Sequence, residues 1–154
     1  MLEPMSEADL DEVLAIEAAS FKNPWVRKAF LAEIKGPNAY AWVVRDEAGP
    51  EKVAGYVCFW EMAEKVHLLN LCVAPDYRRR TLGRLLVDFV VSWARMRAKN
   101  KVVLEVRQGN EAALILYQGH GFRRAGLCRG YYSDTGEDAI LMDMELFASS
   151  GDKT

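Results

Sequence analysis

The pattern of apolar and polar positions divides the chain into helical and extended segments. Apolar residues recur at the 3.6-residue spacing of an amphipathic helix in four segments, which are Glu7–Ala19, Pro24–Ile34, Leu82–Ala98 and 110–118. Alternating or short apolar runs predict strands at Tyr40–Arg45, Val53–Trp60, Val66–Val73, Lys101–Arg107, Phe122–Tyr131 and Ala139–Leu146. Helices come first, an antiparallel meander follows, and a strand–helix–strand crossover comes next. This order predicts an α/β fold with a mixed sheet.

Capping residues support several of these bounds. Ser6 precedes the first helix and Asp9 lies three positions further on, which is close to a capping box. Gly36 is expected to end the second helix together with the proline that follows it. Asn110 is expected to cap the last helix, and residues 46–50 form a turn between two strands.

Leu68 to Leu86 is the most informative stretch. Its apolar strand stops at Pro75 and Asp76, a basic turn with four arginines follows at 78–84, and helical spacing then begins. The first amides of a helix have no internal partner and carry a partial positive charge, so this turn is typical of a site for a pyrophosphate. The glycine-rich dinucleotide fingerprint and the phosphate-loop lysine motif are both absent. Taken alone, the turn is explained equally well as an exposed basic loop that caps a helix.

Length and composition are those of one globular domain. The chain has 154 residues, and we expect the domain at 1–147 and a polar tail at 148–154. The net charge of −2 argues against a general nucleic-acid-binding protein, although 78–84 is a local basic patch. The apolar runs fall short of the roughly 18 residues that a membrane span needs, so no membrane association is expected. The oligomeric state stays open between a monomer and a weak dimer.

Cysteine and histidine usage favours a reducing compartment and no metal site. Cys58, Cys72 and Cys128 are scattered among apolar residues, so we expect buried free thiols and a cytoplasmic location. The chain has no zinc-ligand spacing, and no metal is expected. His67 and His120 are isolated, and each is expected at the surface or in a hydrogen bond.

Two further side chains are candidates for acid–base chemistry. Glu105 lies mid-strand, where cover on both faces of a parallel strand would leave its carboxylate poorly solvated and a stronger base. The alternative is a solvent-facing glutamate, or one paired with Arg107 two residues along the same face. Tyr117 lies seven residues after Asn110 and so on the same helix face. A core tyrosine is the alternative to a phenol that donates a proton.

Several segments together resemble the GNAT superfamily of N-acetyltransferases. Arg78-x-x-Thr81-x-Gly83 is similar to the acetyl-CoA turn of that superfamily, which is usually Arg/Gln-x-x-Gly-x-Gly/Ala. LEVRQGNEAALILYQGHGF at 104–122 and RGYYSDTGEDAILMDMEL at 129–146 resemble its RimI branch more specifically. MSEADLDEVLAIE and NPWVRKAFLAEI near the N-terminus also fit, so the resemblance runs from about residue 3 to residue 147.

Thr81 stands where the family usually has glycine. A β-branched residue at positive φ is an outlier, so either the backbone here is already near-helical or the turn differs from that of the family. The Thr81 hydroxyl is a candidate to cap the helix amides instead. The effect of this residue on cofactor affinity stays open.

The resemblance implies the fold, the cofactor and the catalytic residues. The GNAT fold is a mostly antiparallel mixed sheet of about seven strands, with a central parallel pair splayed around acetyl-CoA and about four flanking helices. Acetyl-CoA would be the cosubstrate of a direct transfer, with Glu105 as general base and Tyr117 as general acid. The residues implied to bind acetyl-CoA are Leu71, Cys72, Val73, Arg79, Arg80, Thr81, Leu82, Gly83, Arg84 and Asn110. Asn110 would then serve both as helix cap and as cofactor contact.

The implied acceptor is the N-terminal amine of a protein, in this branch a small-subunit ribosomal protein. Neutralising a lysine amine at pH 7 costs about 4.6 kcal/mol and an α-amine about 1.1 kcal/mol, so a single carboxylate suits the α-amine better. The residues implied to bind this substrate are Pro24, Trp25, Tyr131 and Tyr132. A helix start with a core anchor is the alternative role of Pro24 and Trp25, and strand packing is that of the two tyrosines.

Three other functions stay open on the sequence. One keeps the fold and the cofactor but acetylates a small-molecule amine or a lysine side chain. Another is a CoA-responsive binding domain without turnover, which the presence of Glu105 and Tyr117 disfavours. The last is nucleic-acid binding through 78–84, which the short patch and the acidic protein disfavour.

Overall fold

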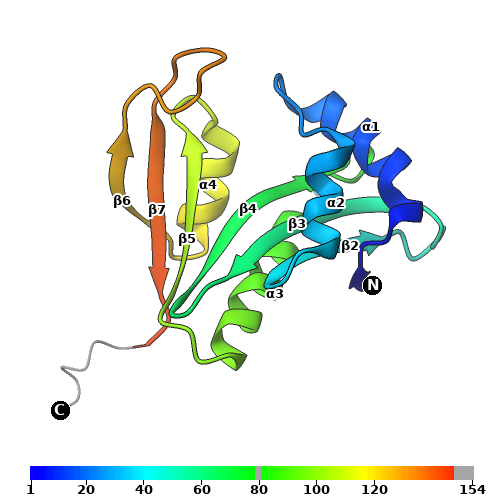
Figure 1. Cartoon of the computed structure of the whole chain (residues 1–154), viewed down its shortest axis with the longest axis horizontal. Coiled ribbons are helices and arrows are strands. Elements are labelled where there is room, and N and C mark those ends of the chain that lie inside the picture. Colours follow the sequence, from blue (N-terminus) through cyan, green and yellow to red (C-terminus); the bar gives the residue numbers. More distant parts are fainter. Residues whose placement is uncertain (79–80, 148–154) are drawn as a thin grey trace. The chain divides into compact units, whose positions relative to one another are not determined.

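The computed structural model describes residues 1–78 and 81–147 of the chain (Figure 1). The helices are α1 (Leu10–Ser20), α2 (Arg27–Lys35), α3 (Leu82–Met96) and α4 (Glu111–Gly119), with short 3-10 turns η1 (Glu7–Asp9) and η2 (Pro75–Tyr77). The strands are β1 (Leu2–Pro4), β2 (Ala39–Arg45), β3 (Val53–Glu61), β4 (Lys65–Val73), β5 (Lys101–Arg107), β6 (Arg123–Cys128) and β7 (Ala139–Glu145). The expected tail at 148–154 and the cofactor candidates Arg79 and Arg80 lie outside the described residues.

The seven strands of the described residues form one mixed sheet in the order β1-β2-β3-β4-β5-β7-β6. β2 is antiparallel to β1 and β3, and β7 is antiparallel to β5 and β6, whereas β4 and β5 are parallel. The parallel register pairs Lys65–His67 with Lys101–Val103. The prediction of a mostly antiparallel mixed sheet of about seven strands, with one parallel pair and four helices, is therefore confirmed. Within the described ranges, no helix combines the length and the apolar character that crossing a membrane requires.

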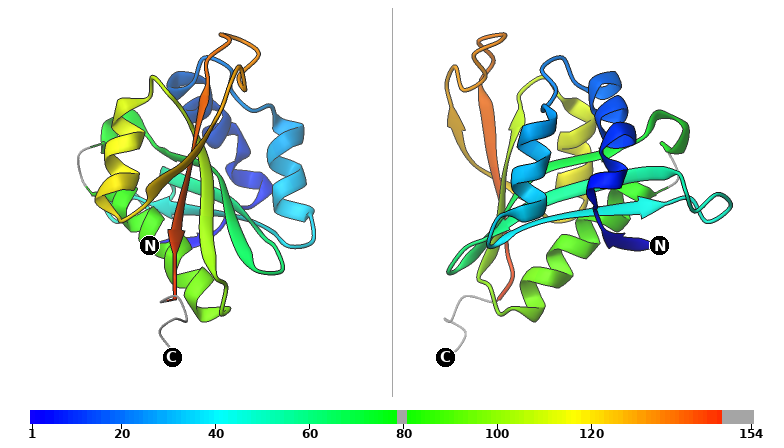
Figure 2. Two further views of the ribbon diagram at one scale, coloured as in Figure 1. Left: turned by 90° about the vertical axis from the view of Figure 1, so that its left-hand side faces the viewer. Right: turned by 45° about the vertical axis from the view of Figure 1, so that its right-hand side comes forward.

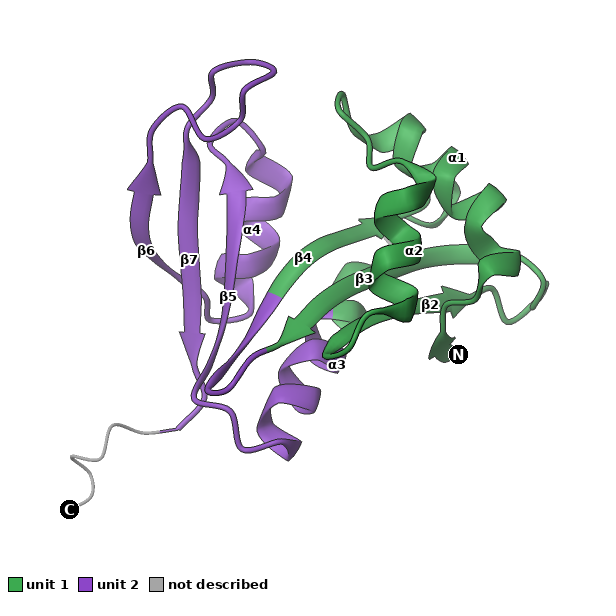
Figure 3. Cartoon of the chain, viewed as in Figure 1, with its two compact units in different colours: residues 1–61, 68–86 green, residues 62–67, 87–154 purple. Residues whose placement is uncertain are grey.

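The chain forms two compact units, coloured separately in Figure 3. Unit 1 comprises residues 1–61 and 68–86, and unit 2 comprises residues 62–67 and 87–154. β4 contributes its first residues to unit 2 and the remainder to unit 1. The two units are therefore described one at a time.

In unit 1, α1 and α2 cover one face of β2 and β3, as both views of Figure 2 show. Leu10 and Val13 of α1 and Phe30 of α2 are completely buried there. Phe30 meets the Tyr56 ring edge-on at 5.8 Å between ring centroids. This apolar face stabilises the unit, because each such side chain contributes roughly 1.5–3 kcal/mol when buried.

A buried carboxylate joins the elements of unit 1. Glu17 of α1 is 1% exposed, and its Oε1 accepts from the Tyr56 hydroxyl at 2.6 Å and from Asn70 Nδ2 at 3.0 Å. Its Oε2 accepts from the backbone N–H of Trp25 at 3.0 Å. Three donors therefore replace the water that burial removes, and they tie α1 to β3, to β4 and to the segment before α2.

The start of the second helix was predicted wrongly. The sequence indicated Pro24, but α2 begins at Arg27, with Val26 extended at the N-cap position. The backbone N–H of Trp25 bonds to Glu17, and its ring lies 5.1 Å from Phe30. These contacts hold residues 21–26 as a connecting segment and make Trp25 a core anchor.

Other bounds differ from the prediction at short elements. The first helix begins as the turn η1, where the Ser6 N–H donates to the Asp9 carboxylate at 2.9 Å, as the capping residues indicated. The three-residue strand β1 was not predicted, because it is too short for an alternating pattern; it pairs Leu2–Pro4 with β2.

Unit 2 contains the first residues of β4, then β5, β7 and β6, with α4 and part of α3. β6 was predicted to continue to Tyr131, but it ends at Cys128, and its pairing with β7 shifts between Arg124 and Gly126. Gly130 then takes a φ of 61°, and its N–H donates to Asp138 at 2.9 Å. Residues 129–138 therefore form a loop between β6 and β7.

The turn after β4 leads into α3 through a left-handed residue. Thr81 has a φ of 63°, and its carbonyl accepts the Leu85 N–H at 3.1 Å. The near-helical backbone that was one alternative for this position is therefore wrong. The conformation is the one that favours glycine, which agrees with the glycine of the family motif. The capping role of the Thr81 hydroxyl stays a prediction.

Replacing Thr81 with glycine is expected to raise the free energy of unfolding by about 1 kcal/mol. A left-handed conformation costs roughly 1–2 kcal/mol in a residue with a Cβ, and the greater freedom of glycine in the unfolded chain offsets part of that gain. Urea denaturation measures the difference, with Thr81→Ala as a control that keeps the Cβ and should gain less. An unchanged or lower free energy in T81G would contradict the strain.

Candidate functional site

The end of β4 in unit 1 holds the first group of cofactor candidates. Leu71 and Val73 are half-buried, and Cys72 between them is buried. The Cys72 thiol donates to Ser20 Oγ at 3.2 Å. Burial raises the pKa of the Cys72 thiol above its ordinary value, so the group stays protonated at neutral pH and is not a nucleophile.

Arg78, the first arginine of the basic segment, contacts this strand. Its guanidinium donates to the Val73 carbonyl at 3.1 Å and to Ser20 Oγ at 3.0 Å, which links residue 78 to β4 and α1. α3 then begins with Leu82, Gly83 and Arg84. The N–H groups of a first helical turn have no partner within the helix, and Arg84 is exposed beside them. These residues fit the phosphates of acetyl-CoA, whose binding here stays a prediction.

Glu105 of β5 lies in unit 2, and its hydrogen bond is to a histidine. Its Oε1 is 2.8 Å from His67 Nε2, and the two side chains are 23% and 20% exposed. The alternative pairing of Glu105 with Arg107 is wrong, because Arg107 binds the carboxylates of Asp134 and Glu137. Glu105 is thus a half-buried carboxylate that is hydrogen-bonded to an imidazole, and its role as general base stays a prediction.

His67 was expected at the surface or in a hydrogen bond, without a role at the site, and the hydrogen bond is observed. In the parallel register His67 of β4 pairs with Val103 of β5. Val103 and Glu105 are two residues apart and so face the same side of β5. The signal was therefore present in the alternation of the two strands, but it became readable only once their register was known.

α4 carries the other two candidates of unit 2. Asn110 caps this helix by accepting the Ala113 N–H at 3.2 Å, as predicted. Tyr117 is 8% exposed and lies 5.7 Å from the Phe122 ring. Burial, and to a lesser extent the nearby Tyr132, raises the pKa of the Tyr117 phenol well above its ordinary value. Tyr117 is therefore fully protonated at neutral pH, the state that a general acid needs.

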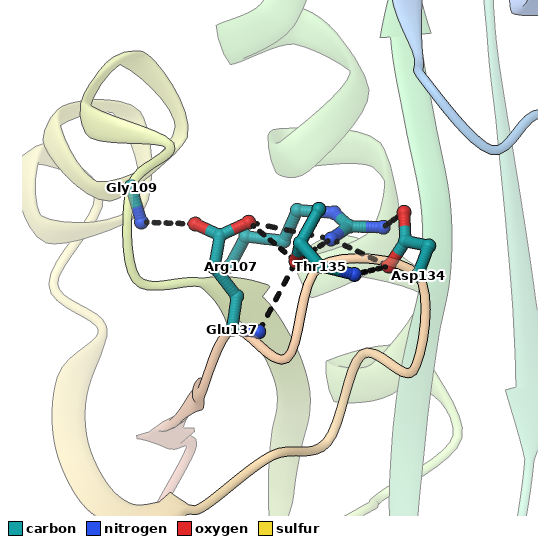
Figure 4. Close-up of polar contacts among 5 residues, drawn as sticks. All are labelled: Arg107, Gly109, Asp134, Thr135 and Glu137. Carbon is teal, nitrogen blue, oxygen red and sulfur yellow. Dashed lines mark hydrogen bonds and ion pairs between the residues drawn. The ribbon is translucent and has the colours of Figure 1, made fainter.

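Arg107 fixes the loop between β6 and β7 (Figure 4). Its two terminal nitrogens donate to Asp134 at 3.1 and 2.9 Å, and one of them reaches Glu137 at 3.3 Å. Glu137 also accepts the Gly109 N–H at 3.1 Å, just before α4 begins. The loop is thereby held to the end of β5 by a bidentate pair and a second carboxylate.

The two tyrosines predicted to bind substrate lie in this loop. Tyr131 is 50% exposed, and its ring meets that of Tyr132 edge-on at 5.0 Å. The Arg107 guanidinium lies over the Tyr132 ring at 4.1 Å. Partial burial raises the pKa of Tyr132 to about 12, and Glu105 adds to the rise in both tyrosines.

The structure thus groups the predicted residues by unit. Glu105, Tyr117, Tyr131 and Tyr132 interact electrostatically within unit 2, where Asn110 caps the same helix that carries Tyr117. Unit 1 holds the remaining described cofactor candidates, together with Pro24 and Trp25. Binding of a substrate by Pro24 and Trp25 stays a prediction. The strand packing that was the alternative for the two tyrosines is wrong, because both lie in the loop that follows the end of β6 at Cys128.

Comparison with known proteins shows which family the chain resembles. The acetyltransferase (GNAT) family model matches residues 10–122. A putative ribosomal protein bS18-alanine N-acetyltransferase of Bacillus subtilis is 33% identical over 135 residues, 87% of each chain. The crystal structure of the ribosomal-protein-S18-alanine N-acetyltransferase from Escherichia coli has a TM-score of 0.85 at 29% identity, over 97% of this chain and 95% of that one.

A more distant neighbour shows the same fold. Arabidopsis thaliana NAA60 in complex with acetyl-CoA has a TM-score of 0.83 at 21% identity, over 94% of this chain and 98% of that chain. Both solved structures share the arrangement of strands and helices described above. The chain belongs to the acetyltransferase (GNAT) family and is an N-acetyltransferase.

Proposed function

We propose that this chain transfers the acetyl group of acetyl-CoA to the N-terminal α-amine of a ribosomal protein, as its relatives are named for doing with bS18. The observation that carries the proposal is the similarity to those relatives over nearly the whole length of both chains. The site residues of unit 2 support it by their chemistry. A ribosomal substrate in turn favours a cytoplasmic location for the enzyme.

The proposal gives Glu105 the role of general base. The acceptor α-amine is mostly protonated at neutral pH and must lose a proton before it attacks the thioester. A carboxylate on a half-buried strand face can take that proton directly or through a water molecule. The smaller cost of neutralising an α-amine, compared with a lysine side chain, favours the N-terminus as acceptor.

Tyr117 is the proposed general acid. When the tetrahedral intermediate collapses, the C–S bond breaks and the leaving thiolate takes up a proton. Because its pKa is raised, Tyr117 is held as the neutral phenol that can donate this proton. The resulting phenolate regains a proton from the nitrogen of the intermediate, which becomes the amide.

A thiol-release assay tests the function. Acetyl-CoA is offered with peptides that have free N-termini, among them a ribosomal-type sequence, with N-terminally blocked copies and small amines in parallel. The proposal predicts turnover only on free N-termini. Turnover on small amines or on blocked lysine-containing peptides would favour the alternative acceptors, and acetyl-CoA binding without any turnover would favour a binding domain.

Replacing Glu105 with glutamine should lower kcat about 10²- to 10⁴-fold at neutral pH, because the amide cannot accept a proton. Acetyl-CoA affinity, measured by calorimetry, should change little. Glu145→Gln, on the exposed end of β7, is the matched control and should retain activity. Full turnover in E105Q would exclude Glu105 as the base.

Replacing Tyr117 with phenylalanine should lower kcat about 100-fold or more while the fold is kept, because only the hydroxyl is lost. The matched control is Tyr40→Phe, whose ring stacks on Phe59 in unit 1. Single-turnover kinetics measures the loss of the chemical step, and thermal melting shows whether the fold is kept. Wild-type rates in Y117F would leave Tyr117 with the core role that the sequence also allowed.

Replacing Arg107 with glutamine should raise the peptide KM several-fold with a smaller change in kcat, because the loop that carries Tyr131 and Tyr132 loses its bidentate anchor. Arg123→Gln is the control. Arg123 lies on β6 and also bridges two carboxylates, but these belong to β7 and not to the loop. Steady-state kinetics at saturating acetyl-CoA measures the peptide KM and kcat separately. An unchanged KM in R107Q would show that the loop does not bind the acceptor.

A further inference from the structure

Residues 21–26 connect α1 to α2 in unit 1 and carry Pro24 and Trp25, which are predicted to bind the acceptor. Both of these residues are half-buried, whereas Val26 beside them is 65% exposed. The segment has no regular secondary structure of its own. Its shape must therefore be set by contacts with the elements around it.

One hydrogen bond ties the middle of this segment to the rest of unit 1. The Trp25 N–H donates to Glu17 Oε2 at 3.0 Å, and among the hydrogen bonds of the described residues no other involves the backbone of 22–25. The Trp25 ring lies 5.1 Å from the Phe30 ring. The segment is thus held at Trp25, through its N–H on one side and its ring on the other.

The other oxygen of Glu17 is fixed by two strands. Oε1 accepts from the Tyr56 hydroxyl of β3 at 2.6 Å and from Asn70 Nδ2 of β4 at 3.0 Å. Burial raises the pKa of Tyr56 far above its ordinary value, so the phenol remains a donor. One buried carboxylate therefore links the connecting segment to the sheet.

The two strands are held in place without Glu17. β3 is paired with β2 along its length, and β4 is its neighbour on the other side in the sheet. The Ala74 N–H, directly after β4, donates to the Ala54 carbonyl at 2.8 Å. The backbone of 22–25 has no such second attachment among the described hydrogen bonds, so loss of the Glu17 acceptor releases the connecting segment first.

We propose that Glu17 is a positioning residue for the acceptor, whose buried side chain holds residues 22–25 in the conformation that binds the N-terminal residues of the protein substrate. The inference rests on the proposed function and deepens it, because it names a residue that sets the affinity for the acceptor. Glu17 is 1% exposed and touches neither substrate. It acts through Trp25.

A buried carboxylate suits this task. Hydrogen bonds to a carboxylate are stronger than those between neutral groups, and burial keeps water from competing for them. A segment that already has its bound conformation loses less conformational entropy when the acceptor binds. Release of the segment should therefore weaken peptide binding and leave the chemical step at saturating peptide unchanged.

Glu17→Gln tests the role, because glutamine offers one acceptor oxygen in place of two to the same three donors. We expect the peptide KM to rise about 5- to 10-fold, the effect of losing one such hydrogen bond. The kcat at saturating peptide should stay within about twofold of the wild type. Steady-state kinetics measures both, and calorimetry should show an unchanged dissociation constant for acetyl-CoA.

Two control variants separate this role from a general loss of stability. Glu33→Gln changes another buried carboxylate of unit 1, which accepts from Trp60 Nε1 at 2.7 Å and has no described contact with residues 22–25. Tyr56→Phe removes one donor to Glu17 Oε1 but leaves the bond to Trp25 intact. Whatever either change does to the melting temperature, the peptide KM should remain that of the wild type.

Hydrogen exchange in the wild type keeps the proposal testable even if E17Q does not fold. The Trp25 amide should exchange at least about 10-fold more slowly than the amides of Lys22 and Asn23. Equally fast exchange, a wild-type peptide KM in E17Q, an equal rise in a control variant or a weakened affinity for acetyl-CoA in E17Q would each overturn the positioning role and leave the proposed function intact. If the wild type acetylates no free N-terminus, the proposed function fails, and the positioning role with it.

Discussion

The hydrogen-bond register between β4 and β5 decides which side chains of unit 2 meet. Parallel pairing of Lys65–His67 with Lys101–Val103 puts the odd-numbered residues of both strands on one face. A shift of one residue would turn His67 and Glu105 to opposite faces and leave a carboxylate without its imidazole. The buried valines and leucines of the other face hold this register, because Val66, Val102 and Leu104 are almost fully buried. A packing constraint on one side of the sheet thus fixes which polar side chains meet on the other.

Two carboxylates of the chain illustrate how surroundings assign a role. Glu17 is buried and accepts from a phenol, an amide and a backbone N–H, so its lone pairs serve the fold. Glu105 is half-buried and bonds to a single titratable side chain. The first arrangement locks α1, β3 and β4 together, whereas the second carboxylate is the one proposed to accept the proton of the acceptor amine. The same residue type is structural in one unit and has a proposed catalytic role in the other.

The sequence predicted those elements whose bounds are set by residues within the element itself. β5 was predicted with its observed bounds from its apolar alternation, and α4 from the Asn110 cap and its apolar spacing. The prediction of where α2 starts failed, because the start depends on a hydrogen bond from Trp25 to Glu17, eight residues earlier in the chain. The prediction of the partner of Arg107 failed for a related reason. Asp134 and Glu137 lie on a loop about thirty residues away, and no local sequence pattern links this loop to Arg107. Thr81 shows the reverse case, since the motif marked the position and only the backbone revealed its left-handed conformation.

The central claim is that the acetyl group goes to a protein N-terminus. The most direct measurement is mass spectrometry of a peptide that offers both a free α-amine and lysine side chains, after incubation with acetyl-CoA and the enzyme. The account predicts one acetyl group per peptide, located by fragmentation on the α-amine. Acetyl groups on the lysine side chains, with the N-terminus unmodified, would contradict it.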